Sequence, residues 1–342
     1  MIPNRHSQII GLWLIFCAAV VYFMIVVGGI TRLTQSGLSM VEWSPIMGVL
    51  PPLGEAAWLD VFNKYKEFPE YQKVNFGMSL AEFKNIFWWE YGHRILGRII
   101  GLLYFIPLII FLIKGMVPKH WRLRFLSLFV LGGLQGLMGW YMVKSGLVDV
   151  PHVSQYRLTA HLGLAIIIFA CMFWYALDFL RGETPRQSSQ ASSTYLQVST
   201  AAVFVVFLMM LSGGFVAGTK AGFIINTFPT MNGEWVPSNW MAMTPWWRNL
   251  FENAVAIQFF HRLLAVLVLL VVIGVFIVSI KQPFKSYALL ALIAVCVQVC
   301  LGVSALVMKV PVVLGASHQA GAVALLAACL FVAHIARKKK RN

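Results

Sequence analysis

The segment FWWEYGHRILGR, residues 87–98, leads into a long apolar run of the sequence. It places Glu90, His93, Arg94 and Arg98 where a chain segment should enter a lipid bilayer. Charged side chains in a membrane-spanning helix are costly unless they are paired or bind a ligand. The segment therefore predicts both a membrane helix and a functional site near its outer end.

The composition is typical of a polytopic membrane protein. The 342 residues are 59% hydrophobic and only 11% charged, and the mean hydropathy is +0.77, values that no soluble domain of this length shows. The net charge of +15 could suggest a nucleic-acid partner. The basic residues, however, lie in short loops between apolar runs, so we expect membrane lipid and no nucleic acid. The five cysteines all lie in apolar runs, which excludes a loop disulfide.

Apolar runs of about 20 residues are long enough to cross a membrane as helices. The sequence contains eight, which predicts an all-α protein with eight transmembrane helices and two long connections, 31–90 and 218–254. The predicted spans are 9–30, 91–113, 123–143, 158–180, 196–217, 255–280, 286–308 and 315–336.

The distribution of Lys and Arg predicts the orientation of these helices. Basic residues gather near the N-terminus, in the short loops at 114–124, 181–195 and 281–285, and in the tail RKKKRN. Positive charge favours the cytoplasmic side. Both termini are therefore expected in the cytoplasm, with the two long connections outside. The first run is longer than a signal-peptide core, has no small-residue cleavage site after it, and is expected to be retained.

The chain contains an internal repeat. Four pairs of segments match in the same order, at offsets of 185, 168, 163 and 157 residues. We expect two tandem four-helix units, residues 1–190 and 191–342, related by a pseudo-two-fold axis along the membrane normal. The pairs are MIVVGGITRLTQSG (24–37) with MMLSGGFVAGTKAG (209–222), EYGHRILGRIIGLL (90–103) with QFFHRLLAVLVLLV (258–271), LQGLMGWYMV (134–143) with VQVCLGVSAL (297–306), and the segments around His161 and His318.

Four histidines occupy equivalent positions of the repeat, in the second and fourth helices of each unit: His93, His161, His261 and His318. Each lies a few residues into its predicted span, so all four should lie at similar depth near the outer surface. Two imidazoles facing each other inside a four-helix bundle can bind a haem iron from opposite sides. A lone histidine near a helix end is usually an interfacial polar residue, but four at equivalent positions favour two ligand sites. Without a neighbouring carboxylate or thiolate ligand, zinc and non-haem iron fit less well.

Arginines accompany the first histidine of each pair. Arg94 and Arg262 directly follow His93 and His261, and a guanidinium group binds carboxylates such as haem propionates. Arg98 could help in the first unit, where its second-unit counterpart is Val266. The alternative is a helical ion pair between Glu90 and Arg94, at spacing i,i+4.

The two units differ at one decisive position. Glu90 lies three residues before His93, whereas Gln258 lies three residues before His261. A buried carboxylate beside a haem can transfer protons or stabilise developing positive charge. We therefore expect a permanent redox haem in the second unit, and a first unit that admits a haem-like molecule and acts on it beneath the long outer loop.

The motifs VVGGITRLTQSGLSM, W-x-P-I-x-G-x-L-P-P, E-Y-x-H-R-x-L-G-R (90–98) and F-x-H-R (259–262), with the histidines of the fourth and eighth spans, resemble the haem A synthase (CtaA) family over residues 10–336. The resemblance implies oxidation of the C8 methyl group of haem O to a formyl group by successive hydroxylations, giving haem A for cytochrome oxidase.

The resemblance also implies roles for individual residues. His261 and His318 would be the axial ligands of a haem b cofactor, His93 and His161 would flank the iron of the substrate haem, and Glu90 would be the essential acidic residue. No cysteine lies between Cys17 and Cys171, so the chain is similar to the branch without a loop cysteine pair. A bacterial inner membrane is the expected location. The haem O synthase that supplies the substrate and an unidentified electron-transfer protein are the expected partners.

Two other functions fit parts of the pattern. A di-haem b-type membrane cytochrome in quinol-linked electron transfer would also need four histidines, but it usually places haems at both membrane faces. A transporter with parallel repeats would need spans interrupted by Gly or Pro. Pro107 interrupts one span, has no second-unit partner, and leaves the histidines unexplained.

Overall fold

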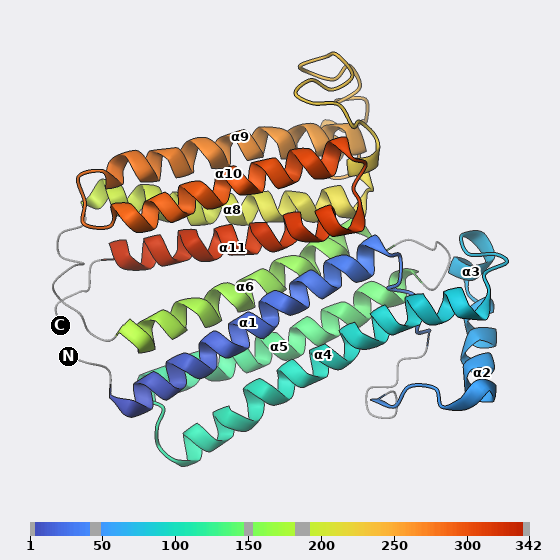
Figure 1. The fold of residues 1–342 in the computed structure, drawn as a ribbon, viewed down its shortest axis with the longest axis horizontal. Coiled ribbons are helices and arrows are strands. Elements are labelled where there is room, and N and C mark those ends of the chain that lie inside the picture. The colour runs from blue at the N-terminus through green and yellow to red at the C-terminus, as the bar shows by residue number, and fades with distance from the viewer. Residues whose placement is uncertain (1–3, 42–48, 147–152, 182–191, 338–342) are drawn as a thin grey trace.

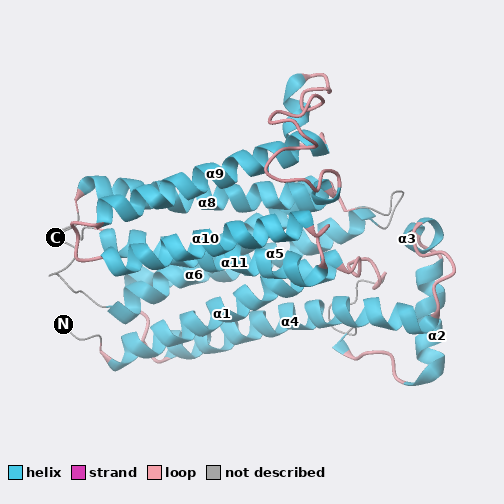
Figure 2. Ribbon diagram, turned by 45° about the horizontal axis from the view of Figure 1, so that its top comes forward, coloured by secondary structure: helices cyan, strands magenta, loops and turns pink. Residues whose placement is uncertain are grey.

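The structure, a computed structural model, describes residues 4–41, 49–146, 153–181 and 192–337. Eight of its helices are long and apolar enough to cross a membrane, which confirms the predicted all-α fold. Within the described ranges no strand forms, and Met231 and Glu234 make an isolated bridge (Figure 2). The long helices are α1 (Arg5–Leu33), α4 (Leu80–Ile113), α5 (Lys119–Gly146), α6 (Gln155–Arg181), α8 (Ser193–Gly218), α9 (Ala254–Ser279), α10 (Lys285–Val307) and α11 (Val312–Ala336).

The long helices form two groups of four, one from each half of the chain (Figure 1). In the first group α1 packs on α4 and α6, and α5 packs on α4 and α6. The second group repeats this arrangement, since α8 packs on α9 and α11, and α10 packs on α9 and α11. The groups meet through α6 against α8 and α11, and through α1 against α11. These recurring pairs support the expected tandem repeat.

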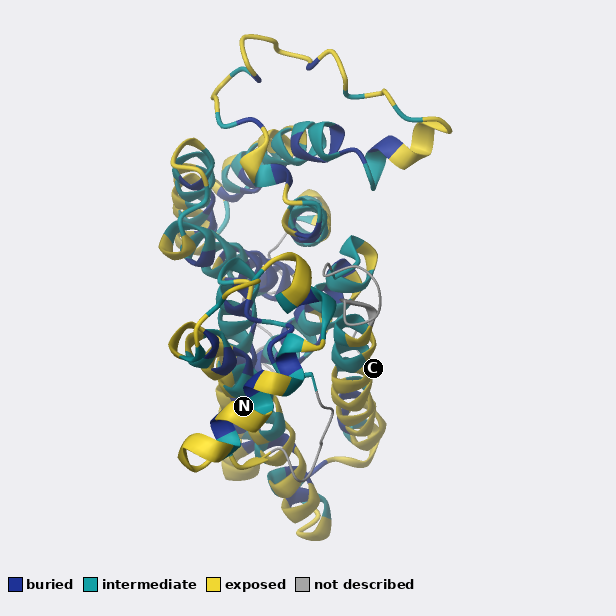
Figure 3. Cartoon of the chain, turned by 90° about the vertical axis from the view of Figure 1, so that its right-hand side faces the viewer, coloured by how far each residue is buried: buried dark blue, intermediate teal, exposed yellow. Residues whose placement is uncertain are grey.

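The centre of the molecule is formed by α1, α6 and α11, which bury more of their apolar windows than the other long helices. Large apolar side chains stay exposed on the other helices, among them Leu102 on α4, Leu270 on α9 and Leu290 on α10. Figure 3 shows exposed stretches along the outside of the helices. An apolar exterior around an apolar core is expected of a protein that lies in lipid.

The start of α1 and the end of α11 lie at the same end of the molecule, and both long connections lie at the other (Figure 1). The first connection contains α2 (Gly54–Lys66) and α3 (Pro69–Lys73), which lie beyond the outer end of α4. The second contains the 3-10 helices η2 (Ala221–Phe223) and η3 (Trp246–Leu250). The placement of the termini in the cytoplasm stays a prediction.

Three sequence features lie wholly or partly outside the described residues. They are residues 43–46 of the W-x-P-I motif, the boundary between the expected units at 190 and 191, and the tail after Arg337.

The helix α4 begins at Leu80, well before the predicted start of its span at residue 91. Ser79 caps it by a reciprocal pair of hydrogen bonds with Glu82, which satisfies the free amides of the first turn. Its outer extension then packs Phe83 and Phe87 against aromatic side chains of α2. We call α2, α3 and residues 80–89 the outer cap. Hydropathy alone detects the lipid-crossing part of a helix, so it placed the start too late.

Polar contacts join the two units at the end opposite the outer cap. Asp178 of α6 accepts hydrogen bonds from His334 Nε2 of α11, at 3.0 Å, and from Arg337. His334 is buried and packs edge-on against Trp174. His334 therefore helps to hold α6 against α11, which gives it a structural role that the sequence did not suggest.

Candidate functional site

The second-unit histidines are held in fixed orientations. Nδ1 of His261 lies 2.7 Å from Oγ of Ser212 on α8. Nδ1 of His318 lies 3.0 Å from Nε2 of Gln298 on α10, which also donates to the His318 carbonyl at 2.8 Å. Both rings are thus held on their Nδ1 side, and among the described residues neither Nε2 has a hydrogen bond. The Ser212 hydroxyl can accept from Nδ1–H of His261, an arrangement that presents Nε2 to a metal, whereas the Gln298 amide nitrogen is a donor and Nδ1 of His318 accepts from it.

The first-unit histidines are held less firmly. His161 meets Gln135 of α5 through Nε2, at a long 3.4 Å, and its Nδ1 is buried without a hydrogen-bond partner. His93 has no hydrogen bond to another described side chain, and the position that matches Ser212 is Val27. The two imidazoles of each unit lie close enough to interact electrostatically, His93 with His161 and His261 with His318. Each unit therefore brings its predicted pair together.

Glycines face all four imidazoles. A Cβ at Gly28 would lie 3.2 Å from Nε2 of His93, and one at Gly139 would lie 3.0 Å from Cε1 of His161. The matching residues of the second unit, Gly213 and Gly302, would place a Cβ 3.5 Å from Cε1 of His261 and 2.8 Å from Cε1 of His318. The missing side chains allow the imidazoles to lie against the neighbouring helices. The same glycines recur at offsets of 185 and 163.

Glu90 lies at the inner edge of the outer cap and is 3% exposed. Its Oε2 accepts hydrogen bonds from Ser39 Oγ and from the Met40 amide, both at 2.8 Å. Its Oε1 accepts from Arg94 at 2.6 Å, and the same guanidinium group donates to the Met40 carbonyl at 2.8 Å. The ion pair expected from the i,i+4 spacing is confirmed. Three donors, one of them cationic, thus surround the Glu90 carboxyl group.

The second unit repeats this arrangement with an amide, that of Gln258, in place of the carboxyl group. Gln258 is also 3% exposed, and its Nε2 donates to the carbonyls of Ala221 and Ile225, each at 3.0 Å. Arg262 donates to the Ile225 carbonyl at 3.2 Å, as Arg94 does to that of Met40. Met40 and Ile225 correspond at the repeat offset of 185. Each arginine thus fastens the chain segment that follows the first helix of its unit.

The arginine positions bear on the expected propionate contacts. Arg94 and Arg262 bind backbone carbonyls of the outer segments and lie half-buried beside their histidines. The Nε of Arg262 is buried and has no hydrogen-bond partner, so this group is available to an acidic ligand. Arg98 lies one turn further along α4 from Arg94, with Val266 at the matching place in α9.

Sequence reasoning missed the side chains that support the histidines: Ser212, Gln298, Gln135 and the glycines opposite the rings. A signal for two of them was present, because Gln135 and Gln298 occupy the same position of the repeated segments LQGLMG and VQVCLG. Comparing the polar residues shared by both units would have found this pair. Ser212 has no such signal, since Val27 replaces it in the first unit.

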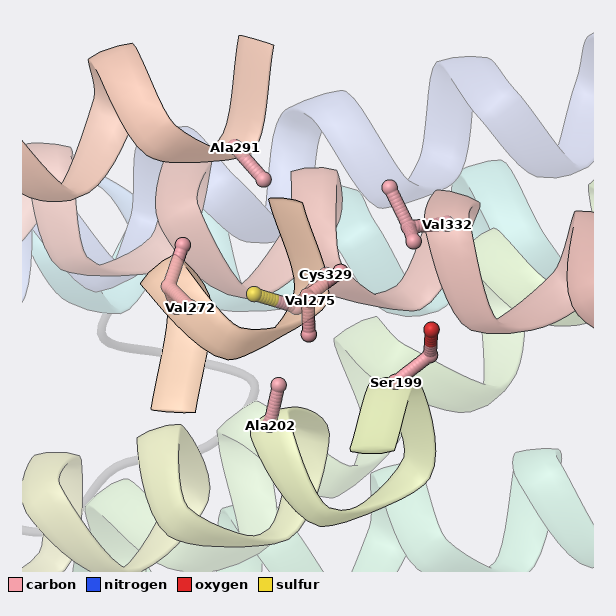
Figure 4. Close-up of a pocket in the computed structure, with 7 residues that line it drawn as sticks. All are labelled: Ser199, Ala202, Val272, Val275, Ala291, Cys329 and Val332. Carbon is pink, nitrogen blue, oxygen red and sulfur yellow. The ribbon is translucent and has the colours of Figure 1, made fainter. Parts of the chain in front are cut away.

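Two cavities of the structure are lined by none of the four histidines, although the second includes Thr159 and Ala160, which directly precede His161 in α6. The one in Figure 4 is lined by small side chains of α8, α9, α10 and α11, and it has no room for a water molecule. Val272 on its wall lies 11 residues beyond His261 along α9, or about 16 Å. A groove of about 410 Å³ runs between α6 and α8, and its lining contains none of the four histidines either. We therefore assign the site from the side chains and not from a cavity.

The residues of each unit fit a haem. Paired imidazoles, facing glycines and a neighbouring arginine are the groups that hold a porphyrin with two axial nitrogen ligands and acidic side chains. The fit is closer in the second unit, where Nδ1 of both rings is held by a polar side chain. The rings of the first unit lack such a pair of Nδ1 partners among the described residues.

Comparison with known proteins gives one consistent family. The family model described as "cytochrome oxidase assembly protein" matches residues 11–330. The chain is 51% identical to the haem A synthase of Nitrosospira multiformis over 96% of this chain and 94% of the relative. It is 48% identical to that of Nitrosomonas eutropha over 96% and 94%, and 45% identical to that of Parvibaculum lavamentivorans over 97% and 94%. The chain therefore belongs to the cytochrome oxidase assembly protein family that includes the haem A synthases.

Proposed function

We propose that this protein is a haem A synthase, a membrane oxidoreductase that converts the C8 methyl group of haem O to a formyl group. The single observation that carries the proposal is the pair of matching histidine sites, one with an acidic residue beside it and one with an amide. Relatives at 45–51% identity over nearly the whole chain are named haem A synthase. A shared activity is the simplest account of that identity together with these sites.

The second unit would hold haem b as the resident cofactor, with His261 and His318 as axial ligands. The haem would supply one-electron redox chemistry when bound. Ser212 and Gln298 orient the two rings, and Arg262 lies where it can pair with an acidic group of the cofactor. Fixed ligands of this kind suit a group that stays in place through many reaction cycles.

The first unit would bind haem O between His93 and His161, with Arg94 and Arg98 following His93 along α4. Here Glu90 is the residue that sets the chemistry apart from the second unit. As a carboxylate fixed by three donors, it can stabilise positive charge that develops on a nearby carbon. Because both carboxyl oxygens of Glu90 already accept hydrogen bonds, we favour this electrostatic role over that of a general base.

The location, the partners and the domain division belong to the same proposal. The eight apolar helices place the protein in a membrane, and we propose the inner membrane of a bacterium as the location. The haem O synthase that supplies the substrate and an electron-transfer protein at the outer end would be its partners. The expected domain division, residues 1–190 for the substrate site and 191–342 for haem b, belongs to this proposal.

Extraction and chromatography of the haems from cells expressing the chain test the proposal. Cells that also make haem O should accumulate haem A with the unaltered protein and haem O with the Glu90→Gln variant. Absence of haem A in the first sample, with the protein folded and its haem spectrum present, would contradict the synthase and favour the di-haem cytochrome.

A further inference from the structure

A second buried carboxyl group lies in the outer cap. Glu70 of α3 is 6% exposed, and its Oε2 is buried without a hydrogen-bond partner. Native proteins rarely leave a buried polar atom unsatisfied, and such atoms concentrate where function requires them. The neighbouring Glu67, at the end of α2, is exposed to solvent. Burial of Glu70 is therefore a property of its place in the cap and not of acidic residues in this segment.

Glu70 lies beside a tyrosine that connects it with the substrate site. Tyr65 of α2 is fully buried, and its hydroxyl accepts a hydrogen bond from Asn75 Nδ2 at 2.8 Å. The Tyr65 ring packs on Phe83 of α4, with centroids 5.0 Å apart. Phe83 and Glu90 lie on one face of α4, two turns apart, or about 10 Å. The electrostatic influence of both Glu70 and Glu90 reaches the Tyr65 hydroxyl.

The two carboxyl groups have opposite environments. Glu90 has three hydrogen-bond donors, including Arg94. Burial away from water raises the pKa of Glu70 to about 8, and the negative charge of Glu90 adds to the effect. Burial and Glu70 likewise raise the pKa of Tyr65. Burial therefore favours the protonated form of Glu70, whereas the carboxyl group of Glu90 accepts from three donors. Pairs of carboxyl groups separated in this way commonly divide the acid and base tasks of a site.

We propose that Glu70 is a proton-relay residue that carries protons from the substrate site beside Glu90 to the aqueous phase outside the outer cap. The proposal rests on the proposed function, with water as the oxygen donor: each hydroxylation, R–CH3 + H2O → R–CH2OH + 2 H+ + 2 e−, passes two electrons to the electron-transfer partner and releases two protons that must leave the site. In one cycle Glu70 gives its carboxyl proton to external water and becomes a carboxylate. It then takes a replacement proton released at the substrate site, so that no net charge accumulates in the cap.

The direction of the pH dependence follows from this cycle. Glu70 accepts a proton from the site only as a carboxylate, a form that becomes more abundant as the pH rises through about 8. Product formation should therefore contain a component that rises through this range. Ionisable groups near Glu70 include Tyr65 of α2, Tyr71 and Lys73 of α3, and Glu90 with its partner Arg94 on α4.

The test compares Glu70→Gln, Glu70→Asp and the exposed control Glu67→Gln in the purified, haem-loaded protein supplied with haem O. Glu70→Gln should lower product formation about tenfold, a smaller loss than direct acid–base catalysis would cause, and should abolish the rise near pH 8. Glu70→Asp should restore the rise. Equal rates and pH profiles for Glu70→Gln and Glu67→Gln would overturn the proposal.

Infrared spectroscopy provides a second readout that does not depend on turnover. A protonated carboxyl band should disappear as the pH is raised through about 8, and it should be missing at all pH values in Glu70→Gln. Absence of this band from the unaltered protein would overturn the proposal even if a variant failed to fold. Because the band requires no product, it also separates failure of the relay from failure of the synthase assignment.

Discussion

The histidine pairs of the two units occupy matching positions but are supported differently. In the second unit both rings have a polar partner at Nδ1, Ser212 for His261 and Gln298 for His318. In the first unit Val27 replaces the serine, and Gln135 meets the other ring nitrogen of His161 at 3.4 Å. The comparison teaches that two similar bundles can keep the same histidines and change their support, which is the basis of the proposed difference between a resident cofactor site and a substrate site.

Substituting the histidines one at a time should have the largest effect, and the result should differ between the two units. His261→Ala and His318→Ala should abolish the haem absorbance of the purified protein, because each removes an axial ligand. His93→Ala and His161→Ala should keep that absorbance and lose haem A production. Absorption spectroscopy of the four purified variants measures this. If the first-unit variants lose as much resident haem as the second-unit variants, the assignment of the resident haem to the second unit is contradicted.

Neutralising the acid of the first unit comes next. Glu90→Gln should reduce haem A formation by about 100-fold or more, because a charged group at the reacting centre contributes that much, and should leave the resident haem spectrum unchanged. Product chromatography and absorption spectroscopy together measure it. Gln258→Glu is the matched second-unit change. It should disturb haem binding without adding activity, because the new carboxylate would face two carbonyl oxygens.

The glycines that face the imidazoles offer a third, intermediate test. In Gly302→Ala the new Cβ would lie 2.8 Å from the His318 ring, closer than real contacts, so the ring must move. Haem affinity should fall by about 10- to 100-fold, as for other changes that disturb ligand orientation, and a haem titration measures it. Gly136→Ala is the control, since no atom lies within 4 Å of its Cβ. Equal haem affinities of the Gly302→Ala and Gly136→Ala variants would show that Gly302 is not needed to position the His318 ring.

Removing one supporting hydrogen bond should have the smallest effect. Ser212→Ala should retain haem but allow the His261 ring a wider range of orientations. Electron paramagnetic resonance would detect this as a change in the iron signal. The reverse change, Val27→Ser beside His93, should leave that signal unaltered. An unchanged signal in Ser212→Ala would show that the serine does not orient the ring.

The sequence was sufficient to predict the elements of the fold. Apolar runs gave the eight membrane helices, and the repeat gave their grouping in two sets of four. The helix α4 begins before the predicted span because hydropathy does not detect its first turns, where Ser79 and Glu82 cap it and Phe83 packs against α2. The aromatic packing of the outer cap depends on contacts between distant residues, which no local pattern encodes.

The candidate site shows the same division. The four histidines, Glu90 and the arginines were predicted from spacing, and the structure brings each histidine pair together. The partners of Glu90 were not predicted, because Ser39 and Met40 lie about 50 residues before it and reach it only through the turn after α1. Glu70 was likewise missed, since nothing in its local sequence distinguishes a buried glutamate from the exposed Glu67.

The position of the resident haem is the central claim, and an experimental density map of the protein purified from its membrane tests it most directly. The account predicts one haem of full occupancy in the second unit, with its iron between Nε2 of His261 and Nε2 of His318. A map with the fully occupied haem between His93 and His161, and none between His261 and His318, would contradict it.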